Sequence, residues 1–405
     1  MAVATSYNVT STQGARENLE NTLRFVEPTV TPLYSTLKQS AAPKATLVET
    51  LADVLASPEI GGVLDGVDME FNADFTDQIN SRVRLGNRVQ TIRRSYAVSR
   101  QAQMIDVAPG ENLLAASKAK SLLELKRDIE ACIASGASQR AGTGSVKALS
   151  QGLGKWTDPA AAVADVPASV RSVSGSRFDF STAGSMTEAN LRTVLQAVYE
   201  ASGSKTDYRL FSSPSVINKI SDMSRANANS ATFNQEVGGG RLSLSITEYQ
   251  SDYGTLKVIP DLFLGREEGA AITGASNVNP IVITSVGHGL VTNDTVTIEG
   301  VEGNTNANGF KTVTRINDDT FSIVTAGNGT YTANTGVWTH GRNTAEGTLN
   351  SNRAYLLPGD DTVSLKFLEG ITTQNLPDLA AGPRAFVEAM VTLCVTNPRA
   401  LGSII

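Results

Sequence analysis

Residues Asp106–Gly136 read DVAPGENLLAASKAKSLLELKRDIEACIASG, and this stretch decides the fold. Apolar side chains recur in it every three or four residues, a spacing that places them on one face of an α-helix. They are Ala115, Ala119, Leu122, Leu125, Ile129 and Cys132. Charged side chains are predicted on the rest of the helix surface: Lys118, Glu124, Lys126, Arg127, Asp128 and Glu130. Pro109, Gly110 and Gly136 delimit about 24 helical residues, which form a rod about 36 Å long.

The segment before this helix is strongly basic. From Gln78 to Ile105 there are six arginines and no acidic residue: Arg82, Arg84, Arg88, Arg93, Arg94 and Arg100. The whole chain holds 34 Lys and Arg against 40 Asp and Glu, so without these six the balance is 28 against 40. Apolar and basic residues alternate over Ser81–Thr91, which predicts a β-ribbon with a turn or bulge at Gly86–Asn87.

A two-stranded ribbon is marginal in water by itself, so this one is expected to lie on a partner. An acidic surface on a neighbouring copy is favoured, because guanidinium groups pair directionally with carboxylates. Nucleic acid is an alternative, since the arginines could contact phosphates, although Tyr96 is the one aromatic residue available for stacking. A solvated basic hairpin without a partner is the third possibility.

Composition and motifs argue against an enzyme. The chain has 405 residues, enough for two or three domains, and no apolar run of the roughly 18 residues that span a membrane. Cys132 and Cys394 sit in apolar patterns and are expected to be core residues, and neither His288 nor His340 has neighbours at metal-ligand spacing. Phosphate-loop and dinucleotide motifs are incomplete. We therefore expect no catalytic residue, no metal and no cofactor.

The remaining host elements are mixed α and β. A helix is predicted near Leu47–Leu55 and another from a capping box at Ser185 and Glu188 to Gly203. A strand at Tyr208–Phe211 and a helix from Pro214 complete a compact α/β unit. The closing segments VSLKF and AFVEAMVTLCVT place alternate apolar residues on one face of long strands. Long strands beside a long helix indicate an α+β layer.

The pattern changes near Ile272. Five short β runs, PIVITSV, TVTIEGV, FKTVTRI, TFSIV and GVWTH, follow at about ten-residue spacing with Gly, Asn and Asp turns. Polar linkers flank them, GREEGAA before and GRNTAEG after. This predicts an all-β domain inserted into a loop of the host domain.

An ordered set of segments resembles the major capsid (major head) proteins of tailed bacteriophages with the Hong Kong 97-type fold. These are RVRLGNRVQTIRRSYAVSRQ, ELKRDIEACIASG, ITEYQSDYGTLKVIPDLFL, RAYLLPGDDTVSLKFLEG and EAMVTLCVTNPRALGSI. TPLYSTL and VETLADVLA resemble the N-terminal arm of that family, without the aromatic residue expected before Asp53.

The resemblance implies a division of the chain. The N-terminal arm would be residues 1–60, the E-loop ribbon 61–108, the peripheral domain with its spine helix 109–184, the axial domain 185–260, a return strand and linker 261–271, the inserted β-domain 272–341, and the closing strands of the peripheral domain 342–405. The six arginines of the ribbon would then make intersubunit contacts as part of the E-loop.

The resemblance also implies the function. Copies would assemble in the host cytoplasm into pentamers and hexamers that tile the icosahedral head shell of a virion. Partners would be the chain itself, a portal, scaffolding or decoration proteins and, non-specifically, packaged DNA, with no membrane. A nucleic-acid-binding structural protein that uses the arginine ribbon is the alternative.

The inserted stretch resembles a small β-domain of phage virion proteins that is named for a half-domain of ubiquitin-activating enzyme. Residues 287–290 (GHGL) and 303–309 (GNTNANG) carry this likeness. His288 is expected to be a locally hydrogen-bonded turn residue. The domain is expected to project outward and to stabilise contacts between capsomers or to contact the host surface or glycans.

Overall fold

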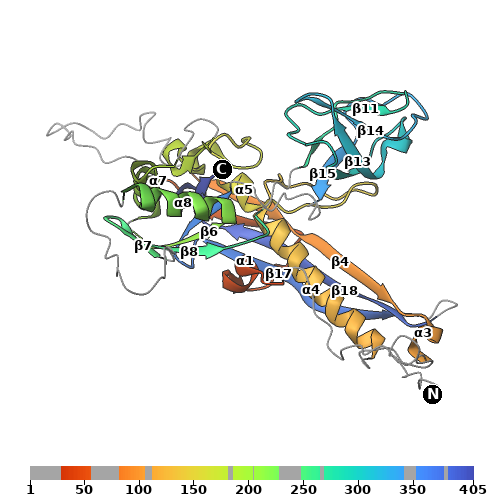
Figure 1. The fold of residues 1–405 in the computed structure, drawn as a ribbon, viewed down its shortest axis with the longest axis horizontal. Helices are drawn as coiled ribbons and strands as arrows, with labels where there is room; N and C mark the ends of the chain where they lie inside the picture. Colours follow the sequence, from red (N-terminus) through yellow and green to blue (C-terminus); the bar gives the residue numbers. More distant parts are fainter. Residues whose placement is uncertain are drawn as a thin grey trace, which may run out of the picture.

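Three β-sheets, each with its own hydrophobic core, and one two-stranded ribbon make up the described chain (Figure 1). The structure is a computed structural model, and it describes residues 29–55, 82–104, 112–180, 186–203, 205–227, 248–264, 269–341, 353–377 and 382–405. Residues 1–28 and 56–60 of the expected N-terminal arm, residues 61–81 and 105–108 of the expected E-loop ribbon and the expected helix cap Ser185 lie outside these residues.

The predicted long helix is confirmed as α4, Leu113–Ala134, which packs on a four-stranded sheet. Asn112 begins the helix, because its side-chain oxygen accepts a hydrogen bond of 3.0 Å from the Leu114 amide. The sheet has the order β1 (Lys38–Ser40), β17 (Val363–Leu376), β18 (Arg384–Val395) and β4 (Gln90–Ala97). In Figure 1, α4 runs lengthwise along β18 and β4.

The buried face of α4 differs in part from the predicted one. Leu125 and Ile129 are fully buried as expected. Two of the predicted core positions are exposed, Ala115 and Ala119. Glu130, predicted on the solvent face, has an exposed fraction of 0%. The buried stripe turns toward Ile133 and Ala134 near the helix end, and Glu130 is the residue one turn before both.

The second sheet has six strands. Its order is β5 (Arg177–Phe178), β19 (Gly402–Ile404), β16 (Ala354–Pro358), β6 (Asp207–Ser212), β8 (Gly254–Pro260) and β7 (Glu248–Ser251). Two helices accompany it, α7 (Glu188–Ser202) and α8 (Pro214–Asn227). The described cap of α7 is Thr187, whose hydroxyl accepts from the Asn190 amide at 3.3 Å, and Gly203 ends the helix in the left-handed region.

The third sheet has seven strands and is built from one continuous part of the sequence. Its order is β10 (Gly274–Ala275), β11 (Ile281–Thr284), β14 (Thr320–Ile323), β13 (Gly309–Arg315), β12 (Thr295–Glu299), β15 (Val337–Gly341) and β9 (Gly269–Ala271). Trp338, Phe321 and Ile298 lie in its core. The sheet includes β9 and so begins three residues before the expected boundary at Ile272.

The prediction for the segment before α4 is wrong in two places. Residues Leu47–Ala52 form strand β2 instead of a helix, and they pair antiparallel with β3, Val83–Arg88. Gly86 and Asn87 lie inside β3 in continuous register, so no turn occurs there. The ribbon therefore consists of β2 and β3, whereas β4 belongs to the four-stranded sheet.

Shorter elements connect these parts. They are α1 (Pro32–Thr36), α3 (Arg100–Met104), α5 (Leu153–Trp156) and single 3-10 turns at Ala168–Val170, Ser174–Ser176, Thr305–Ala307 and Pro398–Ala400.

Candidate interaction surfaces

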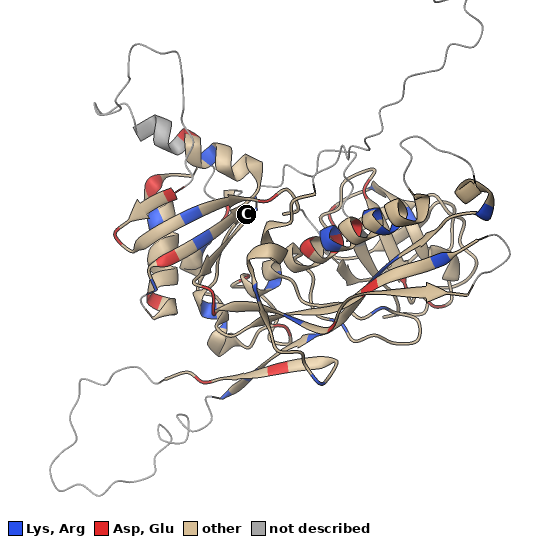
Figure 2. Cartoon of the chain, turned by 90° about the horizontal axis from the view of Figure 1, so that it is seen from below, with Lys and Arg blue, Asp and Glu red and all other residues tan. Residues whose placement is uncertain are grey.

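The β2–β3 ribbon is a separate two-stranded element beside the larger sheets, and part of its surface is exposed. Figure 2 shows it running along the lower side of the molecule, outside the larger sheets. Leu51 and Leu55 are 74% and 92% exposed. Both side chains would be removed from water if another molecule covered this part of the chain. The ribbon therefore offers both apolar and basic groups to a partner.

Two of the six candidate arginines lie at the outer end of this ribbon. Arg82 approaches Asp53 at 3.3 Å, and Arg84 approaches Glu49 at 3.4 Å, across the two strands. Both arginine side chains are 74% exposed. Exposed pairs of this kind contribute little to stability, so either arginine can exchange its carboxylate for one on another molecule.

Two others are used inside the chain. Arg93 pairs with the buried carboxylate of Glu388, and its guanidinium carbon lies 4.3 Å from the ring centre of Phe386. Arg94 makes two bonds to Asp128, of 2.5 and 2.7 Å, and this hydrogen bonding raises the pKa of Arg94. These residues join β4 to β18 and to α4.

The last two candidates lie apart from both groups. Arg88 ends β3 and is half-buried, and Arg100 begins α3 and is exposed. The six arginines that the sequence placed on one ribbon are thus divided over three elements.

Asn87 anchors the base of the ribbon, and sequence reasoning missed it. Its exposed fraction is 2%. Its amide nitrogen donates to the Leu393 carbonyl at 2.7 Å and to the Gln151 carbonyl at 3.0 Å. Its oxygen accepts from the Gln151 amide at 2.7 Å. The one available signal was its position: in the alternating pattern, Asn87 shares a strand face with the apolar residues Leu85 and Val89, so it is a polar residue on the face expected to be buried.

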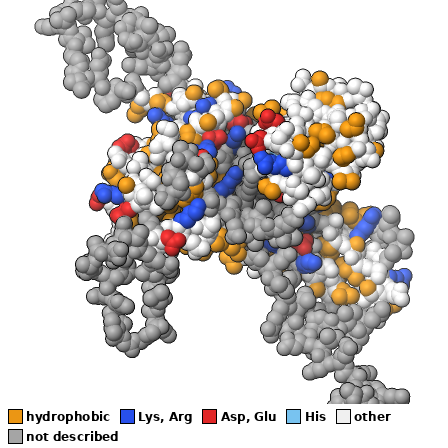
Figure 3. Space-filling view, turned by 45° about the horizontal axis from the view of Figure 1, so that its top comes forward, with side chains coloured by type: hydrophobic (Ala, Val, Ile, Leu, Met, Phe, Trp, Pro, Cys, Tyr) orange, Lys and Arg blue, Asp and Glu red, His pale blue; other side chains and the backbone are white. Residues whose placement is uncertain are grey.

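The seven-stranded sheet carries an apolar outer surface. Figure 3 shows hydrophobic side chains spread over this part at the upper right. The most exposed large ones are Val278, Val286, Val291, Phe310, Ile316 and Val324. Phe310 lies in β13 and is 70% exposed, and Val324 directly follows the neighbouring strand β14 and is 85% exposed.

A carboxylate holds this sheet against a loop of the host part. Glu299, at the end of β12, lies 2.6 Å from the ammonium group of Lys147 and accepts from the Lys147 amide at 3.1 Å. Arg140 is 3.9 Å from the same carboxylate. Burial raises the pKa of Glu299, but the hydrogen bonds from Lys147 outweigh it and hold that pKa below its usual value.

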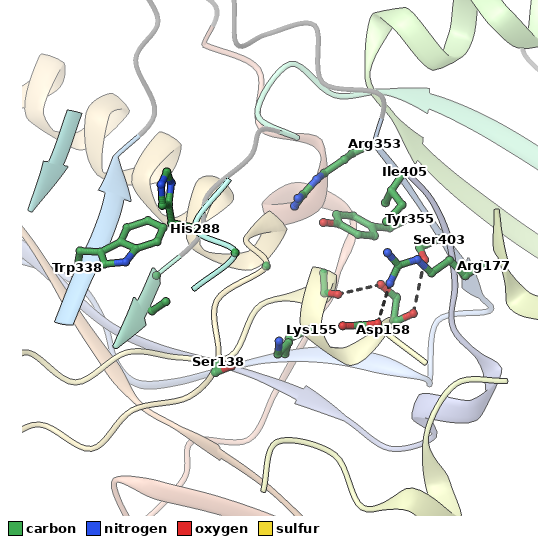
Figure 4. Close-up of a pocket in the computed structure, with 16 residues that line it drawn as sticks. Ser138, Lys155, Asp158, Arg177, His288, Trp338, Arg353, Tyr355, Ser403 and Ile405 are labelled. Atoms are coloured by element: carbon green, nitrogen blue, oxygen red, sulfur yellow. Dashed lines mark hydrogen bonds and ion pairs between the residues drawn. The ribbon is translucent and has the colours of Figure 1, made fainter. Parts of the chain in front are cut away.

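A cavity of about 280 Å³ lies beside this junction (Figure 4). Its walls combine side chains of both parts: Lys155, Asp158, Arg177, Arg353, Tyr355, His288 and Trp338. Arg177 is 2.6 Å from Asp158, so two opposite charges of the wall are already paired. His288 accepts at Nδ1 from the Leu290 amide at 2.9 Å, which confirms its expected role in a local turn. The cavity thus lies between the host part and the seven-stranded sheet.

The N-terminal segment is docked on α4 through Glu130. The carboxylate accepts from the amides of Leu33 and Tyr34, at 2.6 Å each. Burial, followed by the neighbouring carboxyl group of Asp261, raises the pKa of Glu130 to about 8. The sequence pattern had assigned this residue to solvent.

Within the described ranges, no group of His, Cys, Asp and Glu is arranged to hold a metal ion. None of the helices that the structure describes is long and apolar enough to cross a membrane.

The chain was compared with known protein families and solved structures. The sequence profile of the SU10 major capsid protein family matches residues 4–280. No curated protein matched the sequence. Among solved structures, the capsid of an empty GTA particle is similar over 100% of this chain and 99% of its own, with 11% identity and a TM-score of 0.50. The mature capsid of bacteriophage PhiM1 is similar over 100% and 96%, with 9% identity and a TM-score of 0.46. The capsid structure of Cyanophage P-SCSP1u is similar over 96% of this chain and 92% of its own, with 10% identity and a TM-score of 0.45.

Proposed function

Because the chain belongs to the SU10 major capsid protein family, we propose how its parts act in a shell. It has the expected α+β fold of the Hong Kong 97 type. It is a major capsid protein, and its copies associate with one another to form the shell of a virion. The proposal concerns the finer steps of that assembly.

The β2–β3 ribbon acts as a clamp on the adjacent subunit. One observation carries this assignment: Leu51 of β2, Leu55 just after it and the side chains of Arg82 and Arg84 are all largely exposed. Burial of apolar side chains in a neighbour contributes about 25 cal/mol for each Å² removed from water. Repeated head-to-tail contacts of this kind close rings, here pentamers and hexamers, which tile an icosahedral shell.

A charge reversal tests the clamp. Arg84→Glu changes an exposed side chain, so the subunit is expected to fold. The new carboxylate is repelled by Glu49 and by any acidic surface of a partner. The matched control is Arg315→Glu, on the seven-stranded sheet, where another exposed arginine pairs with Asp318. We expect folded subunits whose yield of shells in electron microscopy falls at least about tenfold for Arg84→Glu, because a shell repeats the weakened contact many times. Equal yields from both variants would exclude the clamp.

The seven-stranded sheet is an inserted domain that projects outward from the shell. Its separate core and the pairing of Gly269 with Thr339 support this, because the chain enters and leaves the domain on adjacent strands. The domain stabilises contacts between capsomers or contacts the host surface or glycans.

Removal of the domain separates these roles. Gly269 can be joined to Thr339 by a short glycine turn, since the two are paired in register. Shells that form but dissociate at a lower temperature indicate stabilisation. Shells of unchanged stability that no longer bind cells or glycans indicate host contact. Failure of the folded subunits to form shells at all would contradict a projecting domain.

The remaining steps follow from the same role. The subunits assemble in the host cytoplasm, join a portal and scaffolding or decoration proteins, and enclose DNA without sequence preference. The chain acts as a structural protein and not as an enzyme. The alternative of a nucleic-acid-binding ribbon is not favoured by the family match, and two of its six arginines, Arg93 and Arg94, lie in β4 and are paired with Glu388 and Asp128.

A further inference from the structure

The cavity between the host part and the seven-stranded sheet has positively charged walls. It measures about 280 Å³, which is room for several waters or for one small ion. Among the described residues that line it, the side chains of Lys155, Arg177 and Arg353 are cationic, and that of Asp158 is acidic. Even when a terminal carboxylate at Ile405 is counted, the walls carry a net positive charge.

The acidic side chain of the wall is already used inside the host part. Asp158 Oδ1 lies 2.6 Å from Arg177 Nη1 and accepts from the Ala160 amide at 3.0 Å. Lys155, by contrast, is half-buried and forms no ion pair with a residue of the described ranges. An ammonium group in this position attracts an anion from solution, because water screens its charge only in part.

The two arginines supply planar sets of donors. Arg177 uses Nη1 for Asp158, whereas its Nη2 lies 4.0 Å from Asp179, beyond hydrogen-bond distance. In the view of Figure 4, the guanidinium group of Arg353 lies between His288 and Tyr355 on the cavity wall. A guanidinium group presents its N–H donors as a fork that fits two oxygens of a phosphate or sulfate.

The neutral groups of the wall are used elsewhere or carry no polar side chain. The Tyr355 hydroxyl donates to the Ala134 carbonyl at 3.0 Å, and the Ser138 hydroxyl donates to Asp165 at 2.9 Å. From the seven-stranded sheet, Gly287 and the indole of Trp338 complete the cavity without charge. This side keeps water away, which strengthens the attraction between an anion and the cationic groups.

We propose that this cavity binds a small oxyanion of the phosphate or sulfate type through Lys155, Arg177 and Arg353. The site goes beyond the role of the chain in a shell and does not depend on it. Because the seven-stranded sheet forms one wall, an anion that binds the closed cavity also stabilises the docked position of this sheet on the host part.

Titration calorimetry with inorganic phosphate on the unassembled full chain, at constant ionic strength in sodium chloride, tests the site. We expect saturable binding of one phosphate per chain. Lys155→Gln removes one charge and should weaken binding about tenfold. Lys118→Gln, at an exposed position of α4, is the matched control and should bind like the natural chain. Equal affinities of the natural chain and Lys155→Gln, or binding that does not saturate, would overturn the proposal.

The free ion can be distinguished from the phosphates of nucleic acid in the same experiment. A short single-stranded oligonucleotide exceeds a cavity of this volume, so it should not displace inorganic phosphate. Displacement would assign the cationic groups to nucleic acid and would overturn the proposal of a small-ion site.

Amide hydrogen exchange on the natural chain tests the effect on the docked sheet without any substitution. The Lys147 amide donates to Glu299 across the junction at 3.1 Å, so its exchange reports separation of the two parts. Phosphate at ten times its Kd should slow this exchange about tenfold, because separation opens the cavity and releases the ion. Amides of β13, Gly309–Arg315, are the internal control and should not change. Unchanged exchange at Lys147 would overturn the link between the anion and the docked sheet.

Discussion

Replacement of Asn87 by alanine should detach the base of the ribbon from the body. The side chain makes four bonds shorter than 3.1 Å: to the carbonyls of Leu393 and Gln151, and from the amides of Gln151 and Arg88. Ser150 adds a longer one of 3.3 Å. In Asn87→Ala these backbone groups lose their hydrogen bonds to the side chain. Water does not readily replace them, because Asn87 is only 2% exposed.

The size of the effect follows from the number of groups left without a partner. A hydrogen bond contributes about 1 kcal/mol net, and a buried unsatisfied group costs about 1 to 3 kcal/mol, so the loss of stability is roughly 3 to 5 kcal/mol. Urea unfolding of the unassembled subunit, followed by circular dichroism, measures it. Asn375→Ala, at an exposed position of β17, is the matched control and should stay within about 0.5 kcal/mol of the natural chain. A loss below 1 kcal/mol for Asn87→Ala would refute the anchoring role.

Three further outcomes are expected. The pKa of Glu130 is raised to about 8, so the folded chain binds one more proton than the unfolded chain between pH 4.5 and about 8. The free energy of unfolding should therefore fall with rising pH by up to about 1.4 kcal/mol per pH unit in this window. Urea titrations at pH 5, 6.5 and 8 check this, and a free energy of unfolding that rises over the window would contradict it. Glu299→Ala should speed amide exchange in residues 140–149 several-fold, whereas Asp318→Ala on the same domain should not. Leu125→Ala removes a fully buried side chain of α4 and should cost about 2 to 5 kcal/mol in urea unfolding; a loss below 1 kcal/mol would show that α4 does not organise its core.

Local patterns in the sequence were sufficient for several elements. The spacing of Leu125 and Ile129 located α4, and the even spacing of short β runs located the strands of the third sheet. In both cases the residues that determine the element are neighbours in the sequence, so their periodicity carries the information.

Long-range pairing accounts for the failures. Leu47–Ala52 has a composition compatible with a helix, but hydrogen bonding to β3, more than thirty residues away, makes it a strand. Gly86 and Asn87 form a typical turn pair, yet both continue β3 because Asn87 is bonded to Leu393 in β18. No local pattern records a partner three hundred residues away.

Charged residues were the least predictable part of the candidate surfaces. Arg93 and Arg94 have the same local sequence character as Arg82 and Arg84, but β18 and α4 supply them with carboxylates. Glu130 is buried because α1 offers it two backbone donors. Whether a charged side chain faces a neighbour or its own body depends on tertiary contacts that alternation does not encode.

The pairing of β9 with β15 has a practical consequence for vaccine and nanoparticle design. The chain enters and leaves the domain on two adjacent strands. A different domain inserted between these strands would therefore require only that its own two ends lie close together. A foreign antigen whose own ends are adjacent could take the place of the natural module, and each assembled particle would then carry one copy per subunit in a regular array.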